Sequence, residues 1–261
     1  MFKGPLLAYW NLIFDFSRRE IEKKYRGSYL GLLWLFLSPF LMLAVYTFVY
    51  SFVFRIKIAE MDRLDFVIWL YAGLAVFFFF SDVVTSTPSC IRNSPNYVKK
   101  VIFPLEVLVS SKVISAGFSF LINFLLLVGF LLIKQRSLQM TMVLTPLVIF
   151  PTIVFAYGLA MILAAVGVFV QDTDELSRFF VRVLFYLAPV VYPLALVPKR
   201  AASVIWVNPL TNMVEPFRSV LVLGKLPDWD KFMVFVAISI ALFILGRVCF
   251  QKLRPAFADV L

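Results

Sequence analysis

Histidine is absent from this 261-residue chain, and cysteine occurs only twice. Without histidine, the chain cannot use an imidazole for catalysis or as a zinc ligand. A phosphate-binding loop of the form G-x-x-x-x-G-K-[ST] is missing as well. Gly224-Lys225 is the only Gly-Lys pair, and Ser219 stands where the first glycine of the loop would be. The chain therefore cannot hydrolyse ATP through such a loop.

Long apolar runs are what the sequence has in abundance. Hydrophobic residues make up 62% of the chain, and the mean hydropathy is +0.93. At about 1.5 Å per residue, a helix over 30–54 would reach about 37 Å, enough for a tilted membrane crossing. We predict an all-α, single-domain membrane protein whose six spans lie at about 30–54, 66–84, 107–133, 141–170, 179–196 and 232–250.

The basic residues set the expected orientation. The chain carries 25 Lys and Arg against 15 Asp and Glu, a formal net charge of +10. More of the basic residues adjoin 1–29, 85–106, 171–178 and 251–261 than the opposite loops, which predicts that both termini are cytoplasmic. Anionic lipid explains this charge better than nucleic acid does. Cys90 and Cys249 fall on the same cytoplasmic side, so we expect free thiols and no disulfide.

Residues 1–29 have the pattern of an amphipathic helix at the membrane interface. Leu6, Trp10, Ile13, Phe14 and Ile21 share one face at 3.6 periodicity, while the opposite face and the basic cluster include Arg18, Arg19 and Glu22. Asn11 and Asp15 interrupt the apolar stretch, and charges rather than small residues follow it, so we do not expect a cleavable signal peptide. The helix could be a plain anchor or a mechanical element.

The segment 197–231 does not fit a simple loop. It contains two short apolar pieces, 201–207 and 213–223, and neither can cross a hydrocarbon core of about 30 Å. Proline breaks flank them. Two short helices that enter the outer leaflet and return would fit this pattern and would suggest a gate. The alternative is a surface loop with two interfacial helices.

Acidic pairs offer weak evidence for catalysis. Asp172-Thr173-Asp174 and Asp228-Trp229-Asp230 have a spacing that can hold a divalent metal, but no soluble domain accompanies them, and we expect no metal site. Asp172, Asp174 and Glu175 equally fit the start of the fifth helix, where carboxylates favour the positive end of the dipole. For the charges near the span ends, Asp82, Lys112 and Arg182, we favour snorkelling or structural ion pairs.

Aromatic residues make up 17% of the chain. In the first span, a broad face around Leu43 carries Phe36, Phe40, Tyr46 and Tyr50, and in the fifth span Phe185 and Tyr192 share a face. Aromatic rings can stack on the apolar faces of sugars, so these residues could line a passage for a glycan. The residues alone favour the other interpretation, in which the rings face lipid or pack between helices.

Several segments, in order along the chain, resemble ABC-2 type permeases that export bacterial polysaccharides such as O-antigen, capsule and teichoic acid. The first is Tyr25-Arg26-Gly27-Ser28-Tyr29-Leu30-Gly31, continuing to Ser38-Pro39 and Tyr46-Thr47-Phe48. The next runs from Asn93-Ser94-Pro95-Asn96 to Phe103-Pro104. The likeness recurs at Asn208-Pro209 with Arg218, and at Lys252-Leu253-Arg254 to Phe257-Ala258. Two positions depart from the family pattern: Gln171-Asp172 replaces Arg-Asp, and Ser38-Pro39 replaces Asn-Pro.

This resemblance implies a homodimer of six-span subunits with two copies of an ATP-binding subunit on the cytoplasmic face. The loop after the second span would form a coupling helix that receives the ATPase stroke; its residues would be Asn93, Pro95, Asn96, Lys99, Lys100, Phe103 and Pro104. The re-entrant pair would form an outer gate, with Asn208, Pro209, Glu215, Pro216 and Arg218. The resemblance also favours the glycan passage lined by the aromatic faces of the first and fifth spans.

The expected function is that of a permease subunit, not an enzyme, which moves a lipid-linked polysaccharide across the bacterial inner membrane. ATP and Mg²⁺ would bind the partner, and this chain would bind no cofactor. Two alternatives remain open. One is an ABC-2 exporter of drugs or small molecules. The other is a membrane-embedded enzyme of glycan assembly, for which Asp172, Asp174 and Glu175 are the best catalytic candidates.

Overall fold

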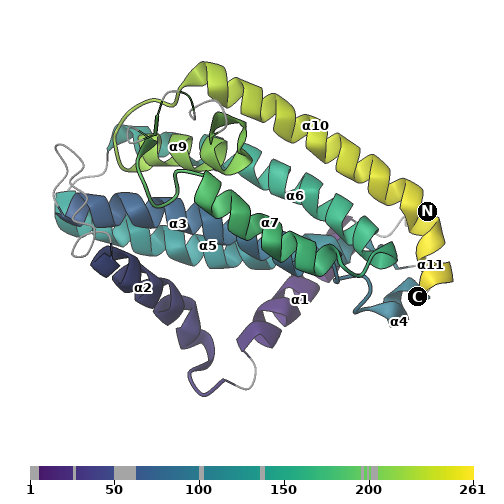
Figure 1. The fold of residues 1–261 in the computed structure, drawn as a ribbon. Coiled ribbons are helices and arrows are strands. Elements are labelled where there is room, and N and C mark those ends of the chain that lie inside the picture. The colour runs from purple at the N-terminus through teal and green to yellow at the C-terminus, as the bar shows by residue number, and fades with distance from the viewer. Residues whose placement is uncertain are drawn as a thin grey trace.

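The computed structural model describes residues 6–25, 28–49, 63–99, 103–135, 139–194, 197–198, 200 and 205–261. Every regular element in these ranges is helical (Figure 1). The α-helices are α1 (Leu6–Tyr25), α2 (Trp34–Thr47), α3 (Arg63–Ser86), α4 (Pro95–Val98), α5 (Glu106–Gln135), α6 (Thr145–Phe169), α7 (Thr173–Leu187), α9 (Pro209–Leu221), α10 (Trp229–Leu253) and α11 (Phe257–Val260). Short 3₁₀ turns precede α2 (Gly31–Leu33) and α6 (Met140–Leu144) and follow α10 (Arg254–Ala256).

Four helical segments in the described ranges are long and apolar enough to cross a membrane. They are Leu64–Ser86, Glu106–Lys134, Met140–Phe169 and Trp229–Val260. The shortest has 23 residues, which corresponds to about 34 Å at about 1.5 Å per residue. These segments confirm the predicted helices at 66–84, 107–133, 141–170 and 232–250, and they make the chain a multi-pass membrane protein.

The predicted first and fifth spans correspond to shorter helices. Helix α2 has 14 residues and α7 has 15, so each extends only a little over 20 Å. Helix α2 starts late because the chain turns at Tyr29–Leu30 and Gly31 takes a left-handed φ of +49°. The rest of that predicted span, 50–54, lies outside the described residues. The six-span count is therefore not confirmed.

The bounds predicted for the fifth span, 179–196, were wrong. Helix α7 begins six residues earlier, at Thr173, and it ends at Leu187 because Pro189 follows Ala188. Proline disfavours the helical conformation of the residue before it, and Ala188 is extended, with φ −103° and ψ 150°. Helix α7 includes the charged residues Glu175, Arg178 and Arg182. It is strongly amphipathic, with one polar and one apolar face, rather than apolar on all sides.

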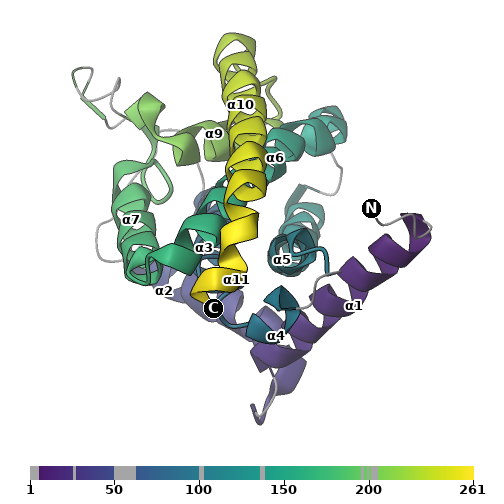
Figure 2. The ribbon, with the colours of Figure 1, turned by 90° about the vertical axis from the view of Figure 1, so that its right-hand side faces the viewer.

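Helix α3 forms the centre of the bundle, with α5 beside it and α6, α7 and α9 around it (Figures 1 and 2). Helix α10 lies along the outer side of α6, where two glycines allow the backbones to approach closely. A Cβ atom on Gly158 would lie 2.7 Å from the Cα atom of Phe243, and one on Gly246 would lie 3.0 Å from the carbonyl carbon of Gly158. Small residues at such crossings are typical of helix packing in membranes.

The predicted interface helix is confirmed as a helix, α1, and it packs obliquely across α5 at one end of the bundle (Figure 2). Its apolar residues divide between two environments. Ile13 is buried against the bundle, whereas Trp10 is 60% and Phe14 69% exposed. Such a helix is suited to contact the bundle on one side and the lipid headgroup region on the other.

Candidate functional site

The loop between α3 and α5 forms a compact unit with α1. Its single helical turn, α4, starts after Ser94 with Pro95 in the first turn, where proline costs no hydrogen bond. Tyr97 of this turn packs against Phe103, with ring centroids 4.7 Å apart. Phe16 of α1 contacts both rings, at 5.2 Å from Tyr97 and 5.5 Å from Phe103. We call these three residues the aromatic joint.

The outer surface of this loop is polar. Asn93, Pro95, Asn96 and Lys99 are exposed, whereas Phe103 and Pro104 are half-buried; Lys100 lies outside the described residues. Of the predicted coupling residues that the structure describes, four are exposed on one side of the loop, while Phe103 and Pro104 are partly covered by the rest of the protein. Sequence reasoning missed Phe16 and Tyr97, because apolar periodicity does not show which helix will pack on a distant loop.

Ion pairs hold both flanks of the loop. The Arg92 guanidinium pairs with the Asp174 carboxylate at the start of α7 and donates a 2.9 Å hydrogen bond to the Gly167 carbonyl in α6. On the other flank, Arg254 Nη1 lies 3.2 Å from Glu106 Oε1, and Nη2 donates to the Phe103 carbonyl oxygen at 3.3 Å. These contacts tie the loop to α5, α6, α7 and the end of α10.

Cys90 lies beneath this loop and is buried among apolar side chains. Burial raises the pKa of the Cys90 thiol to about 12, because a thiolate is poorly solvated there. Both cysteines are free, as predicted.

Two further ion pairs join α1 to the bundle. Lys24 pairs with Asp82 of α3, and Glu20 pairs with Lys112 of α5. The expectation of structural ion pairs is confirmed for Asp82 and Lys112. Arg182 instead donates from Nε to the Arg178 carbonyl at 3.4 Å on the exposed face of α7. Arg18 pairs with Glu22 within α1 at 2.9 Å, while the Arg19 guanidinium lies 5.7 Å from the centre of the Phe16 ring.

The predicted passage residues separate into two groups. Phe36 and Phe40 of α2 are exposed and line a groove of about 270 Å³ that reaches Phe130 of α5. Tyr46 and Phe185 instead face each other, with ring centroids 6.3 Å apart, and Phe185 packs on Phe77 at 4.5 Å. Tyr192 is half-buried, and its hydroxyl donates to the Tyr186 carbonyl at 3.2 Å. Tyr50 lies outside the described residues.

The predicted gate residues centre on a buried cation in α9. Arg218 has no exposed surface. Its Nε donates to the Trp69 carbonyl at 3.0 Å, its Nη1 and Nη2 donate to the carbonyls of Pro189 and Val190 at 2.5 Å, and Nη1 lies 3.2 Å from Glu215 Oε1. Such complete pairing is what a buried charge requires. Arg218 therefore fastens α9 to α3 and to the turn after α7.

The start of α9 is fixed in a similar way. Asn208 caps the helix by accepting a hydrogen bond from the Leu210 N–H at 3.0 Å, and its Nδ2 donates to the Leu184 carbonyl at 3.0 Å. Pro209 occupies the first turn, and Pro216 lies inside the helix and is buried. With 13 residues, α9 extends about 20 Å and does not cross a membrane by itself. Most of the other predicted short piece, 201–204, lies outside the described residues.

Comparison with known proteins now decides the family. A family model described as "ABC-2 type transporter" matches residues 12–222, from within α1 to the end of α9. The chain belongs to the ABC-2 type transporter family. This ABC-2 chain is 28% identical over 256 residues to the O-antigen export system permease protein RfbA of Myxococcus xanthus, covering 97% of this chain and 96% of that one.

Two other relatives of the ABC-2 chain are similar over most of their length. An O-antigen export system permease protein RfbA of Klebsiella pneumoniae is 24% identical over 253 residues, covering 97% of this chain and 95% of the relative. The polysialic acid transport protein KpsM of Escherichia coli is 19% identical over 240 residues, covering 91% and 92%.

Three acidic residues in or beside the two triplets of the ABC-2 chain form ion pairs. Asp174 pairs with Arg92, Glu175 with Arg178 at 2.9 Å, and Asp228 with Lys231 at 2.7 Å. The hydrogen bond from Lys231 lowers the pKa of the Asp228 carboxyl, so that group is ionised at neutral pH. Among the described residues, no three Cys, Asp or Glu side chains converge as metal ligands do.

Proposed function

We propose that the chain is the membrane-spanning subunit of an ATP-driven exporter that moves a lipid-linked polysaccharide across the bacterial inner membrane. The observation that carries the proposal is similarity over nearly the whole chain to permeases named for O-antigen export and polysialic acid transport. The missing phosphate loop supports a separate ATP-binding subunit as the source of energy. The chain forms the wall of the polysaccharide passage, and the partner subunit carries out ATP hydrolysis.

The coupling face is the exposed side of the 93–104 loop. Asn93, Asn96 and Lys99 meet the ATP-binding subunit, and the aromatic joint passes its movement to α1. Support comes from convergence: α1, α4 and the end of α10 meet at this loop through Phe16, Tyr97 and Arg254. On this proposal, α4, α11 and the charged end of α1 are cytoplasmic.

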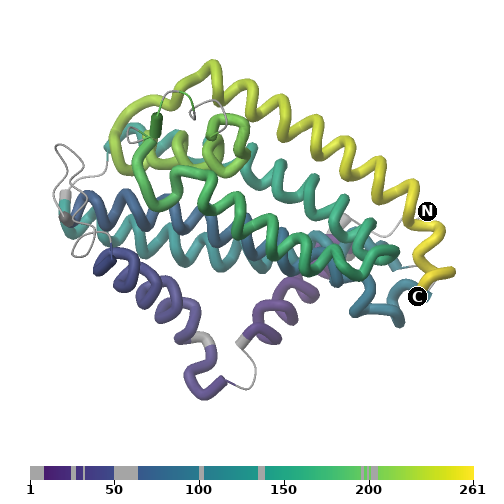
Figure 3. The backbone as a smooth tube through the Cα atoms, viewed as in Figure 1, coloured from purple at the N-terminus to yellow at the C-terminus, as the bar shows by residue number. Residues whose placement is uncertain are grey.

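The remaining architecture completes six crossings and a dimer. Helices α2 and α7 are parts of the first and fifth spans, and α9 belongs to a re-entrant pair at the outer face. In favour of this placement, α9 and the segments around it gather toward the end of the bundle opposite α4 and α11 (Figure 3). Exposed aromatic residues on α2 and α7, among them Phe36, Phe40 and Phe179, line the passage once a second copy covers them.

The deciding experiment is co-purification from detergent with a candidate ATP-binding subunit, followed by an ATPase assay with lipid-linked glycan. We expect a complex with two copies of each chain, and ATP hydrolysis that changes when the glycan is added. A rate of ATP hydrolysis that does not change with the glycan but does change with small hydrophobic compounds would instead indicate a drug exporter. Glycan synthesis by the isolated chain without any ATPase would indicate an enzyme; the ion pairs of Asp174 and Glu175 weigh against that.

A further inference from the structure

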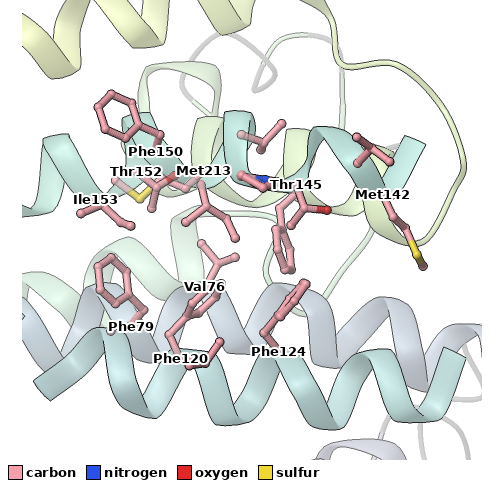
Figure 4. Close-up of a pocket in the computed structure, with 17 residues that line it drawn as sticks. Val76, Phe79, Phe120, Phe124, Met142, Thr145, Phe150, Thr152, Ile153 and Met213 are labelled. Carbon is pink, nitrogen blue, oxygen red and sulfur yellow. The ribbon is translucent and has the colours of Figure 1, made fainter. Parts of the chain in front are cut away.

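A cavity with a polar lining, here called the polar pocket, lies between the end of α1 and helices α2, α3 and α5. Its volume is about 320 Å³, at the low end of the range of about 300–1,000 Å³ typical of small-molecule sites. A larger cavity of about 610 Å³, between α5 and α6, shares Phe79 and Phe120 with it (Figure 4). The larger cavity is lined by apolar side chains and two buried threonines, which select no ligand. The polar pocket has a more specific chemistry.

Hydroxyl groups and one ion pair line the polar pocket. They belong to Lys24 of α1, Ser38 of α2, Ser81, Asp82 and Thr85 of α3, and Ser119 of α5. These groups can be reached from the pocket: Ser38 is exposed, and the side chains of Asp82 and Lys24 are 25% and 39% exposed. Within the described ranges, the hydroxyls of Ser38 and Ser81 make no hydrogen bond to the protein. Both can therefore donate to a ligand and accept from it.

The charges of the polar pocket cancel. Lys24 and Asp82 are its two charged residues among those that the structure describes, and they pair with each other through Asp82 Oδ2. An anionic ligand such as a phosphate would have to compete with this carboxylate for Lys24. The other oxygen, Oδ1, is left to accept a hydrogen bond. The lining thus favours an uncharged ligand whose groups both donate and accept, as hydroxyl groups do.

An aromatic surface and the depth of the pocket narrow the choice further. Trp34 of α2 lines the pocket and is 38% exposed. Aromatic rings stack on the apolar faces of sugars. Asp82 lies inside the apolar segment Leu64–Ser86, and Ser119 lies near the middle of α5. Carboxylates within such segments are rare and mark substrate paths.

We infer that the polar pocket binds an uncharged sugar unit of the lipid-linked polysaccharide. Trp34 provides the apolar contact, and Ser38, Ser81 and Asp82 bond the sugar hydroxyls. The inference rests on the proposed function, which supplies the glycan. The pocket is separate from the aromatic passage, since neither Phe36 nor Phe185 lines it. On the orientation proposed above, it lies toward the cytoplasmic end of α3 and holds a sugar before the chain enters the passage.

Two positions on α5 provide a matched pair of variants. Ser119→Phe places a ring in the polar pocket, and Gly117→Phe places the same ring in the larger cavity, where a Cβ atom would meet no atom within 4 Å. Ser38→Ala and Ser81→Ala each remove one free hydroxyl without adding volume. Their control is Ser239→Ala, which removes a hydroxyl of α10 that bonds the Phe235 carbonyl.

The test uses the full chain in vesicles with two photoreactive probes that share one alkyl chain. One carries an uncharged disaccharide and the other phosphocholine, each with a diazirine on the headgroup, and labelled peptides are mapped by mass spectrometry. We expect the sugar probe to label peptides containing Ser38 and Ser81 about fivefold more than phosphocholine does, as one additional hydrogen bond predicts. Ser119→Phe should abolish this labelling, and Ser38→Ala and Ser81→Ala should each lower it severalfold. Gly117→Phe and Ser239→Ala should leave it unchanged.

Equal labelling by the two probes, or stronger labelling by phosphocholine, would overturn the inference and assign the pocket to lipid headgroups. ATP hydrolysis that depends on the glycan would stand in that case, so the proposed function would survive. Sugar labelling without glycan-dependent hydrolysis would instead contradict the proposed function and retain the site. The size-exclusion profile of Ser119→Phe must match the wild type; if it does not, the two alanine variants give the same decision.

Discussion

The guanidinium carbon of Arg218 lies 3.5 Å from the centre of the Trp69 ring, although 149 residues separate the two in the chain. A cation placed over an aromatic face in a water-free site is strongly favoured. The arrangement leaves no room for a side chain at Gly73, where a Cβ atom would lie 2.7 Å from the Arg218 guanidinium carbon. The proposed outer gate is thus rigidly joined to the central helix, and α9 and α3 should move as one body.

Replacing Arg218 should therefore unfold this end of the bundle. Arg218→Leu leaves the carbonyls of Trp69, Pro189 and Val190 buried and unpaired, and we expect a loss of about 3–5 kcal/mol. The measurement is thermal unfolding in detergent, followed by tryptophan fluorescence. Arg178→Leu is the control, because its ion pair with Glu175 is exposed and local. Equal melting temperatures for the two variants would contradict the proposed role of Arg218.

The contact between α6 and α10 should depend on its two glycines. Gly158→Leu forces a side chain into the backbone of α10 at Phe243, and we expect a destabilisation of about 1–3 kcal/mol or failure to insert. Gly129→Leu, in α5, meets open space and should behave as wild type. Yield and monodispersity after detergent extraction distinguish the two. Normal extraction of Gly158→Leu would show that α10 is free to move away.

The attachment of α1 can be tested by exchanging charges. Glu20→Lys places two cations together at Lys112, and Lys112→Glu places two carboxylates together; each should weaken the docking of α1 by about 1 kcal/mol. The double exchange restores an ion pair and should restore protease resistance of α1. A double variant as sensitive as either single one would mean that the pair does not hold the helix.

The aromatic joint should transmit ATP-driven movement. Phe16→Ala removes the ring that contacts both Tyr97 and Phe103, so we expect ATP hydrolysis to continue while polysaccharide export falls at least several-fold. Phe14→Ala, an exposed position on the same helix, is the control. Export is followed by surface antigen, and hydrolysis by phosphate release. Unchanged export in Phe16→Ala would remove the joint from the coupling route.

Burial of the Cys90 thiol predicts that it stays unreactive over a wide pH range. Because burial raises the pKa of Cys90 to about 12, the thiol stays protonated and unreactive at neutral and mildly alkaline pH. Maleimide labelling of a Cys249→Ser variant, in which Cys90 is the only thiol, should remain negligible from pH 7 to pH 9. The same variant in denaturant should label fully. Rapid labelling of the folded variant at pH 7 would show that the loop opens.

The local hydropathy pattern of the sequence was sufficient to predict the four long helices. The spans at 66–84, 107–133, 141–170 and 232–250 were predictable because membrane crossing requires an apolar run of a certain length, which the sequence states directly. The bounds of the helices at the predicted first and fifth spans were harder to predict. Pro189 ends helix α7 early, and the turn before Gly31 makes helix α2 start late. The remaining apolar residues of the two predicted spans show no periodicity from which these boundaries could be predicted.

The sequence by itself determined that this chain is helical, lies in a membrane and contains no phosphate loop, because hydropathy and motif spacing are local properties. Only the tertiary structure decided which partners the charged side chains meet, as in Arg218 with Trp69, Arg92 with Asp174 and Lys112 with Glu20. It also decided that Phe16 of α1 packs against Tyr97 and Phe103 of the loop after α3. These contacts join residues far apart in the chain, and their geometry exists only once the helices have packed.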